Sequence, residues 1–357
     1  MSAMPAVQAD ATTSVAGAVS IRYPRLRYMG SKYALLPYLE NALNELGGSV
    51  VADPFCGSGV VSYLAHAMGK EVWSSDYLAF PCVLTRAVVA NHDVRLSDDD
   101  VNELLGPNVD GRSFISDTYS GIIFNPDDLA TLDSAWSVLS TWEGARRDIA
   151  IASLILAAAR KQPRGVFTVT ASRYAIYDDG RRQLRMSMRD HIREAVRDWN
   201  RAVVRDGARA RVLQMSVHEA PQGADVVYLD PPYAPPRDDN DYIKRYWFLE
   251  GLANYWHDGR AEIMESTMTR KLPKRPTPFG SRKTIEEALG ATLERFAKSS
   301  LILSYGSNAV PTLDALEGMM REVKRNVRVC RIGHRYHFGN ARHSVRRQAF
   351  EYLILGE

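Results

Sequence analysis

The chain contains few residues of the kinds that form disulfide frameworks or structural metal sites. Its three cysteines, Cys56, Cys82 and Cys330, have neither paired nor CxxC spacing, which argues against a disulfide framework and against structural zinc. The eight histidines form no HxxxH pair and no His/Cys cluster suited to zinc. We therefore expect a protein without a metal, folded in a reducing compartment such as the cytoplasm.

Long apolar runs are also missing. The most apolar helix-like stretch, residues 149–159, is well short of the roughly 20 residues that a membrane span requires. Residues 1–20 are rich in Ala, Thr and Ser but lack the basic start and apolar centre of a signal peptide, so we expect a disordered leader. With 357 residues, 45% of them hydrophobic, the chain can bury a large core and is expected to form two domains without membrane partners.

Charge is distributed unevenly, although the formal net charge is only +3. Residues 92–143 hold eleven acids and two bases, whereas residues 160–211 hold fourteen bases and six acids. Residues 321–347 hold nine bases and one acid, and residues 270–283 hold six bases and no acid. Charged faces are often merely solvated, but basic clusters in a nearly neutral chain are typical of a polyanion-binding surface. We expect the basic segments to face nucleic acid and the acidic segment to face away from it.

Two apolar strands are each predicted to end in an Asp-Pro turn. Val226–Leu229 stops at Asp230-Pro231-Pro232-Tyr233, and Val51-Ala52 leads into Asp53-Pro54-Phe55-Cys56-Gly57-Ser58-Gly59. Proline lacks the N–H that a central strand needs, so the chain leaves the sheet at both places. Open α/β sheets bind ligands beyond the carboxyl ends of their strands. Either motif alone is also compatible with an ordinary turn, but the pair indicates a site.

Together these segments resemble a known family. Asp53–Gly59 is similar to the S-adenosyl-L-methionine-binding motif of amino-methylating DNA methyltransferases, and Asp230–Tyr233 is similar to their catalytic tetrapeptide. Arg27–Lys32 resembles the segment that precedes the first motif in the D12-class, Dam-like adenine-N6 methylases, and the order of the segments matches their α-type arrangement. The resemblance implies transfer of a methyl group from S-adenosyl-L-methionine to adenine N6 at a specific site in duplex DNA, with the base flipped out.

The first motif and the next strand end supply the expected cofactor site. Asp53 at the strand tip is expected to orient the loop and meet the methionine ammonium, and Phe55 to flank the cofactor. Gly57 and Gly59 would permit a tight turn and close approach of the ligand. Asp76 ends the following strand, where an acid can accept both ribose hydroxyls or simply cap the next helix.

Four further residues are expected to border the cofactor. The resemblance implies that Tyr28 and Lys32 contact the cofactor, with Lys32 meeting the carboxylate of S-adenosyl-L-methionine. It also implies that Asp230 lies beside the cofactor. His218 follows the strand before the catalytic one and is expected near the adenine of the cofactor. A nicotinamide dinucleotide is excluded by spacing, because Ser62 stands where the third glycine of GxGxxG would fall.

The tetrapeptide suits methyl transfer to an exocyclic amine. Adenine N6 is a poor nucleophile because its lone pair is delocalised into the ring. The Asp230 carboxylate and the Pro231 carbonyl can accept its two N–H groups, with Pro232 fixing the turn, and Tyr233 offers a stacking face to the flipped base. Orientation and electrostatic stabilisation then suffice, and no metal is expected.

The order of predicted elements indicates an α/β fold with a seven-stranded Rossmann-like sheet. Alternating strands and helices predict a parallel sheet with right-handed crossovers, and the resemblance implies that the last two strands close it as an antiparallel pair. The rhythm breaks at residue 91 and resumes after residue 206. We expect a leader (1–20), a catalytic and cofactor-binding domain (21–90 and 207–357) and an inserted target-recognition domain (91–206). The expected strands are 49–52, 71–74, 212–217, 226–229, 300–304, 327–338 and 350–355.

Residues 165–188 alternate in polarity around Asp178-Asp179-Gly180, which predicts a β-hairpin. A two-stranded ribbon fits the DNA major groove, so we expect sequence recognition in this hairpin; the alternative is that it only supports its domain. Residues 238–242 are expected to form a mobile loop and residues 245–250 the start of a packed helix, and the resemblance implies that this segment is a lid over the target base. The candidate DNA contacts are Arg173, Arg181, Arg182, Gln183, Arg185, Arg245, Arg342 and Arg346.

Several alternatives remain open at this point. Cytosine-N4 enzymes more often carry Ser at position 230, and related RNA or protein-amide methylases usually carry Asn there. A catalytically silent DNA-binding regulator would be expected to lose Asp230, Tyr233, Gly57 or Gly59, and all four are present. The sequence is compatible with a monomer or a homodimer, with an orphan enzyme or one that has a cognate restriction nuclease, and with a location in the cytoplasm at the nucleoid.

Overall fold

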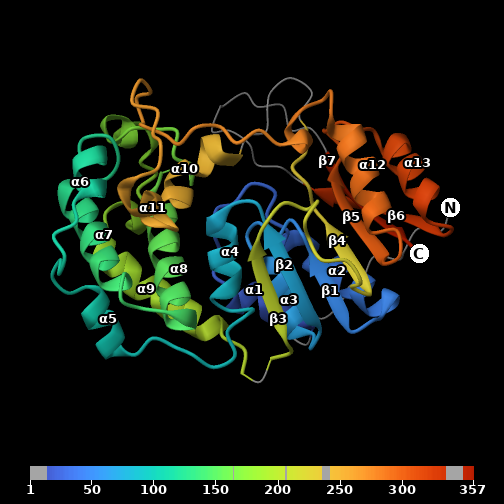
Figure 1. Ribbon diagram of the computed structural model, residues 1–357, viewed down its shortest axis with the longest axis horizontal. Coiled ribbons are helices and arrows are strands. Elements are labelled where there is room, and N and C mark those ends of the chain that lie inside the picture. Colours follow the sequence, from blue (N-terminus) through green and yellow to red (C-terminus); the bar gives the residue numbers. More distant parts are fainter. Residues whose placement is uncertain (1–13, 164, 206, 235–241, 335–348) are drawn as a thin grey trace.

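A seven-stranded sheet forms the centre of the computed structural model, which describes residues 14–163, 165–205, 207–234, 242–334 and 349–357. The strand order is β3-β2-β1-β4-β5-β7-β6 (Figure 1). Strands β1 to β5 pair in parallel, and β7 is antiparallel to both β5 and β6. This order confirms the predicted fold class. The bounds are β1 (Val50–Asp53), β2 (Glu71–Asp76), β3 (Ala210–Gln214), β4 (Val226–Leu229), β5 (Ser300–Gly306), β6 (Val327–His334) and β7 (Ala349–Gly356).

Most of these strands lie within a few residues of their predicted positions, and β4 has the predicted bounds. Strand β3 ends earlier than expected, at Gln214, where Met215 N donates a last hydrogen bond to the Asp76 carbonyl at the end of β2. The predicted continuation of the sixth strand over 335–338 lies outside the described residues.

Alternating side chains of the central strands form the two faces of the sheet. Val226 and Tyr228 belong to one hydrophobic core, and Val227 and Leu229 belong to the other. The first face is covered by helices from the N-terminal half of the chain, and the second by α12 (Ile285–Arg295) and α13 (Leu313–Val323). The helices on the first face are α1 (Val15–Arg22), α2 (Leu36–Leu46), α3 (Val60–Ala67) and α4 (Ala79–Arg86). Burial on both faces explains why the central strands are continuous apolar runs.

The expectation of a disordered leader up to residue 20 is wrong for its last part, because α1 begins at Val15. The Ser14 side chain accepts a hydrogen bond from Gly17 N, and the Glu40 carboxylate accepts hydrogen bonds from Val15 N and Ala16 N. Ala16 and Val19 are buried in the core. The helix is therefore fixed by a distant carboxylate and by packing, neither of which a composition rich in small residues reveals. Residues 1–13 lie outside the described part of the chain.

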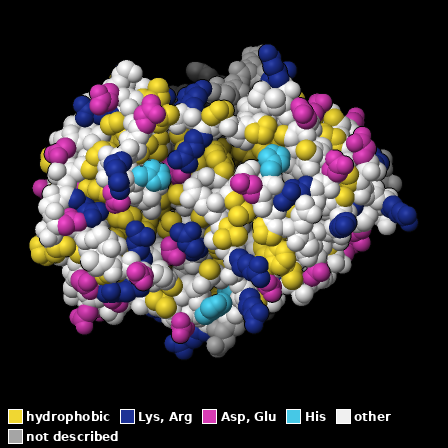
Figure 2. Space-filling view, viewed as in Figure 1, with side chains coloured by type: hydrophobic (Ala, Val, Ile, Leu, Met, Phe, Trp, Pro, Cys, Tyr) yellow, Lys and Arg dark blue, Asp and Glu magenta, His cyan; other side chains and the backbone are white. Residues whose placement is uncertain are grey.

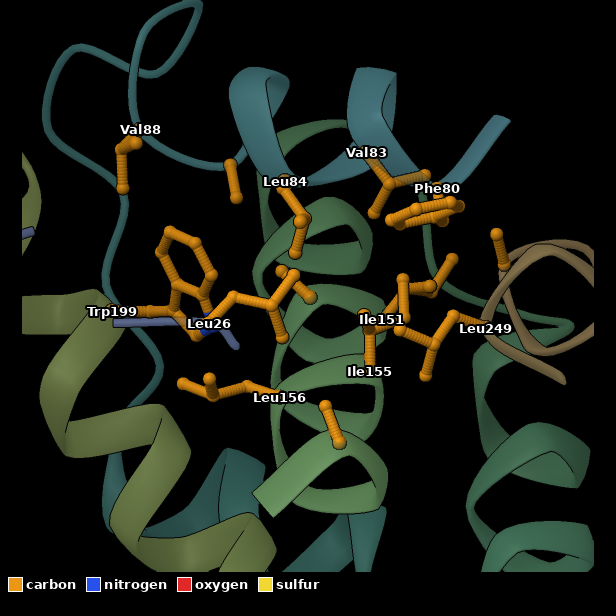
Figure 3. Close-up of a cluster of buried hydrophobic side chains, with 14 of the residues drawn as sticks. Leu26, Phe80, Val83, Leu84, Val88, Ile151, Ile155, Leu156, Trp199 and Leu249 are labelled. Carbon is orange, nitrogen blue, oxygen red and sulfur yellow. The ribbon is translucent and has the colours of Figure 1, made fainter. Parts of the chain in front are cut away.

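A second group of helices stands beside the sheet, on the left of Figure 1. Its centre is α8, which includes the most apolar run of the sequence and packs against both α4 and α9. Figure 3 shows Ile151, Ile155 and Leu156 of α8 in one cluster with Leu84 of α4 and Trp199 of α9. The hydrophobic core thus continues from the sheet into this group. Its helices are α5 (Asp98–Leu104), α6 (Phe114–Tyr119), α7 (Pro126–Leu139), α8 (Gly144–Lys161), α9 (Met188–Ala202), α10 (Tyr242–Leu252) and α11 (Tyr255–Gly259). None of the helices in the described ranges is long and apolar enough to span a membrane.

The predicted β-hairpin over 165–188 is wrong. The segment contains two short 3-10 helices, η2 (Ala171–Tyr177) and η3 (Arg182–Leu184), and its backbone bonds to other parts of the chain: Phe167 N donates to the Arg245 carbonyl and Ala171 N to the Ile122 carbonyl. The polarity alternation reflects real alternating burial, since Phe167 and Val169 are buried while the residue between them is exposed. Alternation alone cannot distinguish a paired strand from an extended segment without a strand partner.

Candidate active site

A cavity of about 230 Å³ lies at the carboxyl ends of β1, β2 and β4. Asp53 and Asp76 are the last residues of β1 and β2, and Asp230 follows β4 directly. The cavity wall includes every predicted cofactor-binding residue except Gly59: Tyr28, Lys32, Asp53, Phe55, Gly57, Asp76 and Asp230. Three segments that are far apart in the sequence therefore meet at one edge of the sheet.

The glycine loop turns through backbone conformations that favour glycine. Gly57 has φ +49° and donates its N–H to Asp76 Oδ2 at 3.1 Å, which ties the loop to the end of β2. Gly59 has φ +79°, and a Cβ there would lie 2.5 Å from the Tyr23 hydroxyl and 2.7 Å from Thr85 Oγ1. Gly59 is thus required for packing behind the loop, whereas we expected it to admit the ligand.

Two buried carboxyl groups face the cavity with hydrogen-bonding capacity. Asp53 Oδ2 accepts a 2.6 Å hydrogen bond from Ser62 Oγ, while its buried Oδ1 has no hydrogen-bond partner among the described residues. Asp76 accepts hydrogen bonds from Leu78 N (3.0 Å) on Oδ1 and from Gly57 N (3.1 Å) on Oδ2. Burial raises the pKa of each carboxyl to about 7. Such groups suit a ligand that brings a cation and hydroxyl groups, because it would restore the stabilisation that burial removes.

The catalytic loop carries a cluster of polar contacts around Lys32. The Lys32 ammonium lies 2.9 Å from Asp230 Oδ1 and donates to the Gly30 carbonyl (2.8 Å) and the Tyr233 hydroxyl (3.0 Å). Burial raises the pKa of Asp230 to about 6, against the lowering effect of Lys32. Asp230 is therefore ionised at neutral pH, and Lys32 is held against it in addition to facing the cofactor cavity.

The four residues of the tetrapeptide occupy different positions. Asp230 and Pro232 line the cavity, while Pro231 is buried in the turn. The Tyr233 ring lies against the Tyr305 ring, with centroids 4.6 Å apart, and its hydroxyl is directed into the polar cluster. Tyr233 is thus anchored at both its ring and its hydroxyl.

Aromatic residues form the remaining walls of the cavity. Tyr28 stacks on Tyr246, with ring centroids 5.1 Å apart and planes 15° apart. Across the cavity, Phe55 meets the edge of Phe279 at 5.1 Å, and His218 stacks on Phe279 at 6.2 Å. The predicted position of His218 at this wall agrees with the structure, whereas Phe279 was not anticipated.

Sequence reasoning also missed two buried glutamates. Glu250 is 1% exposed, accepts hydrogen bonds from Ala79 N and Phe80 N at the start of α4, and pairs with Arg275 at 2.9 Å. Arg275 directly precedes residues 276–279, which line the cavity, so the pair holds that wall in place. Glu351 on β7 is 3% exposed and contacts Lys32 at 3.4 Å. Neither glutamate belongs to a local pattern, because the partners of each are remote in sequence.

The predicted DNA contacts are not equally available. Arg181 donates from Nη2 to the carbonyls of Gln162 (2.7 Å) and Pro163 (2.6 Å), and its side chain is only 14% exposed. Arg182 and Arg185 are 70% and 72% exposed, and pair with Glu194 (2.5 Å) and Asp178 (3.8 Å) respectively. The other candidates divide into Arg173 (exposed), Gln183 and Arg245 (half-buried), and Arg342 and Arg346, which lie outside the described residues.

Basic side chains on the face shown in Figure 2 are spread over both halves of the molecule. They are interspersed with acidic side chains. The sequence clusters of basic residues therefore do not gather into one uniform patch on this face among the described residues.

The fold and the cavity define a class of protein. A parallel sheet closed by an antiparallel pair, with a glycine loop and acids at the tips of neighbouring strands, is the arrangement of an S-adenosyl-L-methionine-dependent methyltransferase. Residues 28–108 match the family described as D12 class N6 adenine-specific DNA methyltransferase. The match covers Tyr28, Lys32, the glycine loop and Asp76.

A curated relative is similar over most of the chain. Type II methyltransferase M2.HphI of Haemophilus parahaemolyticus is 25% identical over 328 residues, which covers 88% of this chain and 93% of the relative. Among solved structures, the rRNA methyltransferase AviRa of Streptomyces viridochromogenes is 14% identical and aligns over 99% of this chain and 96% of its own, with a TM-score of 0.33. The family match and the curated relative confirm the resemblance found in the sequence. They also confirm the predicted enzyme, an adenine-specific DNA methyltransferase that uses S-adenosyl-L-methionine.

Proposed function

We propose that this chain methylates N6 of an adenine within a short recognition sequence of double-stranded DNA, after the adenine has rotated out of the helix. One observation carries the proposal: the Asp230 turn and the glycine loop border the same cavity at the carboxyl edge of the sheet. Methyl donor and target amine can therefore meet in one place. A base inside the duplex would be too enclosed to reach such a cavity, which is why flipping is part of the proposal.

The residues present fit the cofactor. The unpartnered Asp53 Oδ1 suits the methionine ammonium, and Asp76 at the end of β2 suits the ribose hydroxyls. Phe55, Phe279 and His218 form a wall against which a purine ring can lie. When bound, S-adenosyl-L-methionine supplies an activated methyl group on its sulfonium sulfur.

The catalytic loop would orient the target amine. Among the described residues, Lys32 and Tyr233 both contact the Asp230 carboxylate at Oδ1. This arrangement leaves Oδ2 as an acceptor for one N–H of adenine, and the Pro231 carbonyl would accept the other. The two acceptors would favour a pyramidal nitrogen whose lone pair points toward the methyl group. Tyr233 would offer its ring to the flipped base for stacking.

We further propose that sequence recognition lies in the helical group beside the sheet. Residues 91–206 form most of this group, and α10 and α11 complete it. The exposed side chains of Arg173, Arg182 and Arg185 are its best candidates for DNA contacts, because they project from the segment that replaces the predicted hairpin. We also propose that the protein acts in the cytoplasm at the nucleoid, where its double-stranded DNA substrate is found.

Methylome sequencing tests this function most broadly. The chain and its Asp230→Ala variant would be expressed separately in a host that lacks DNA methylation, and modified bases would be read directly from genomic DNA. We expect N6-methyladenine confined to one short motif, and none with the variant. If N4-methylcytosine were found in a motif instead, the target base would be cytosine and the proposal of adenine would be wrong. Unmodified DNA with methylated RNA would instead favour the RNA alternative.

A further inference from the structure

We propose that Glu351, on the last strand of the sheet, is a positioning residue for methyl transfer: it fixes the Tyr233 hydroxyl and thereby directs Lys32 onto Asp230. This inference rests on the proposed function, because it assigns a task within the same site. Glu351 lies on β7, more than a hundred residues from the catalytic loop in sequence, and pairs in register with Gly306 of β5. The sheet itself therefore brings Glu351 to the active site.

The Glu351 carboxylate is the shared acceptor of the cluster. Its Oε1 accepts a short hydrogen bond from the Tyr233 hydroxyl and a 3.2 Å hydrogen bond from Ser304 Oγ, and lies 3.4 Å from Lys32 Nζ. Glu351 and Ser304 are 3% and 0% exposed. A buried carboxylate is stable only when hydrogen-bond donors or cations satisfy its oxygens. The Glu351 carboxylate therefore holds the Tyr233 hydroxyl, the Ser304 hydroxyl and the Lys32 ammonium in place.

Counting protons gives the cluster a direction. The Tyr233 hydroxyl has one proton but lies within reach of both Glu351 Oε1 and Asp230 Oδ1. The Lys32 ammonium has three, which are satisfied by the Gly30 carbonyl, Asp230 Oδ1 and the oxygen of Tyr233. If Lys32 donates a proton to the Tyr233 hydroxyl oxygen, the Tyr233 hydroxyl can donate its own proton to Glu351 Oε1. The chain of donors then runs from Lys32 through Tyr233 to Glu351, and Lys32 keeps one proton for Asp230.

The space around Tyr233 supports the same arrangement. A Cβ at Gly306 would lie 3.2 Å from the Tyr233 ring and 3.6 Å from Glu351 Oε2. The ring is confined by Gly306 and Tyr305, and its hydroxyl by Glu351. A base stacking on Tyr233 would therefore meet a ring whose orientation is already set, which reduces the ordering cost at the transition state.

The electrostatic effect of Glu351 reaches Asp230. Burial raises the pKa of Asp230 most, Lys32 lowers it, Glu351 raises it and the Tyr233 hydrogen bond lowers it. Removing the charge of Glu351 should therefore lower the pKa of Asp230, and removing the Tyr233 hydroxyl should raise it. Among the described residues, the charges of Asp53, Tyr228 and Tyr242 also act on this site.

The test compares Glu351→Gln, Tyr233→Phe and the double variant, with Glu357→Gln as a control just beyond the same strand. Single-turnover methylation of cognate duplex DNA would be measured from pH 5 to 9, together with the Kd for S-adenosyl-L-methionine. We expect each single variant to lower the rate on the order of tenfold, the effect of one lost hydrogen bond, with the double variant no slower than the worse single one. The acid limb of the pH–rate profile should move to lower pH in Glu351→Gln and to higher pH in Tyr233→Phe. Glu357→Gln should match the unchanged chain.

Each outcome decides one claim. An active wild-type chain with an unchanged rate and acid limb in Glu351→Gln would overturn the positioning role and leave the proposed function intact. If the wild-type chain methylates no DNA, the proposed function fails, and Tm values of the same variants decide the inference. Equal Tm shifts for the single and double variants would then support the Glu351–Tyr233 contact, whereas additive shifts would overturn it.

Discussion

Replacing Asp76 by Asn should weaken binding of S-adenosyl-L-methionine. The Asp76 carboxylate accepts hydrogen bonds from Gly57 N and Leu78 N, so it both shapes the loop and faces the cavity. In Asp76→Asn, one oxygen becomes an NH₂ group, which faces a backbone donor or a ribose hydroxyl. Side-chain volume is kept, so packing is not the cause of any loss.

The size of the effect follows from the contacts. A hydrogen bond to a charged group is worth about 1.5–3 kcal/mol. Loss of one such bond to the ribose should raise the Kd by about 10- to 150-fold, since each 1.4 kcal/mol corresponds to about a factor of ten. Rearrangement of the Gly57 turn would raise the Kd further, so we expect a value near the upper end of this range.

Isothermal titration calorimetry at pH 8 measures the Kd directly. Asp225→Asn is the matched control, because Asp225 Oδ2 also accepts backbone hydrogen bonds, from Ser49 N (2.7 Å) and Val50 N (2.9 Å), at the opposite end of β1. Asp225→Asn should lower Tm but preserve the Kd. An unchanged Kd in Asp76→Asn would refute the reasoning and reduce Asp76 to a group that only caps the backbone.

Three further predictions concern catalysis, pH and recognition. Asp230→Ala should abolish transfer in a radiolabelled-methyl assay while DNA binding persists; a variant that still turns over normally would remove Asp230 from the chemistry. Because the pKa values of Asp53 and Asp76 are both raised to about 7 in the free protein and the ligand favours their ionised forms, binding must expel protons below pH 7. The Kd measured by calorimetry should therefore rise as pH falls below 7 and level off above 8, and a flat profile would contradict this. Arg182→Ala, which alters an exposed side chain, should weaken DNA binding or relax sequence preference with Tm preserved, whereas Arg181→Ala should mainly lower Tm; equal effects of both on Tm would contradict this division.

The sheet could be predicted from the sequence because each strand carries its own signal. Val226–Leu229 is apolar, short and ended by prolines, and these properties hold wherever the strand lies in the chain. Asp53 and Asp76 could be placed at strand ends for the same reason. Parallel strands bring such ends to one edge, so residues distant in sequence could be assigned to one site.

The parts that could not be predicted depend on remote partners. The segment around Phe167 has strand-like polarity, but the Phe167 N–H bonds to the Arg245 carbonyl and the Phe167 ring stacks on Phe248, 81 residues away. Helix α1 depends on Glu40 in the same way. Glu351 is recognisable only once β7 is placed beside β5, because its partners come from three other segments. Local patterns specify elements, and these cases require the tertiary contacts.

The identity of the methylated base tests the central claim most directly. Purified chain would be incubated with S-adenosyl-L-methionine and unmethylated duplex DNA, and the DNA digested to nucleosides and analysed by mass spectrometry, with Asp230→Ala as the control. The account predicts N6-methyldeoxyadenosine from the wild-type chain and none from the variant. N4-methyldeoxycytidine, or no methylated nucleoside from a chain that binds both cofactor and DNA, would contradict it.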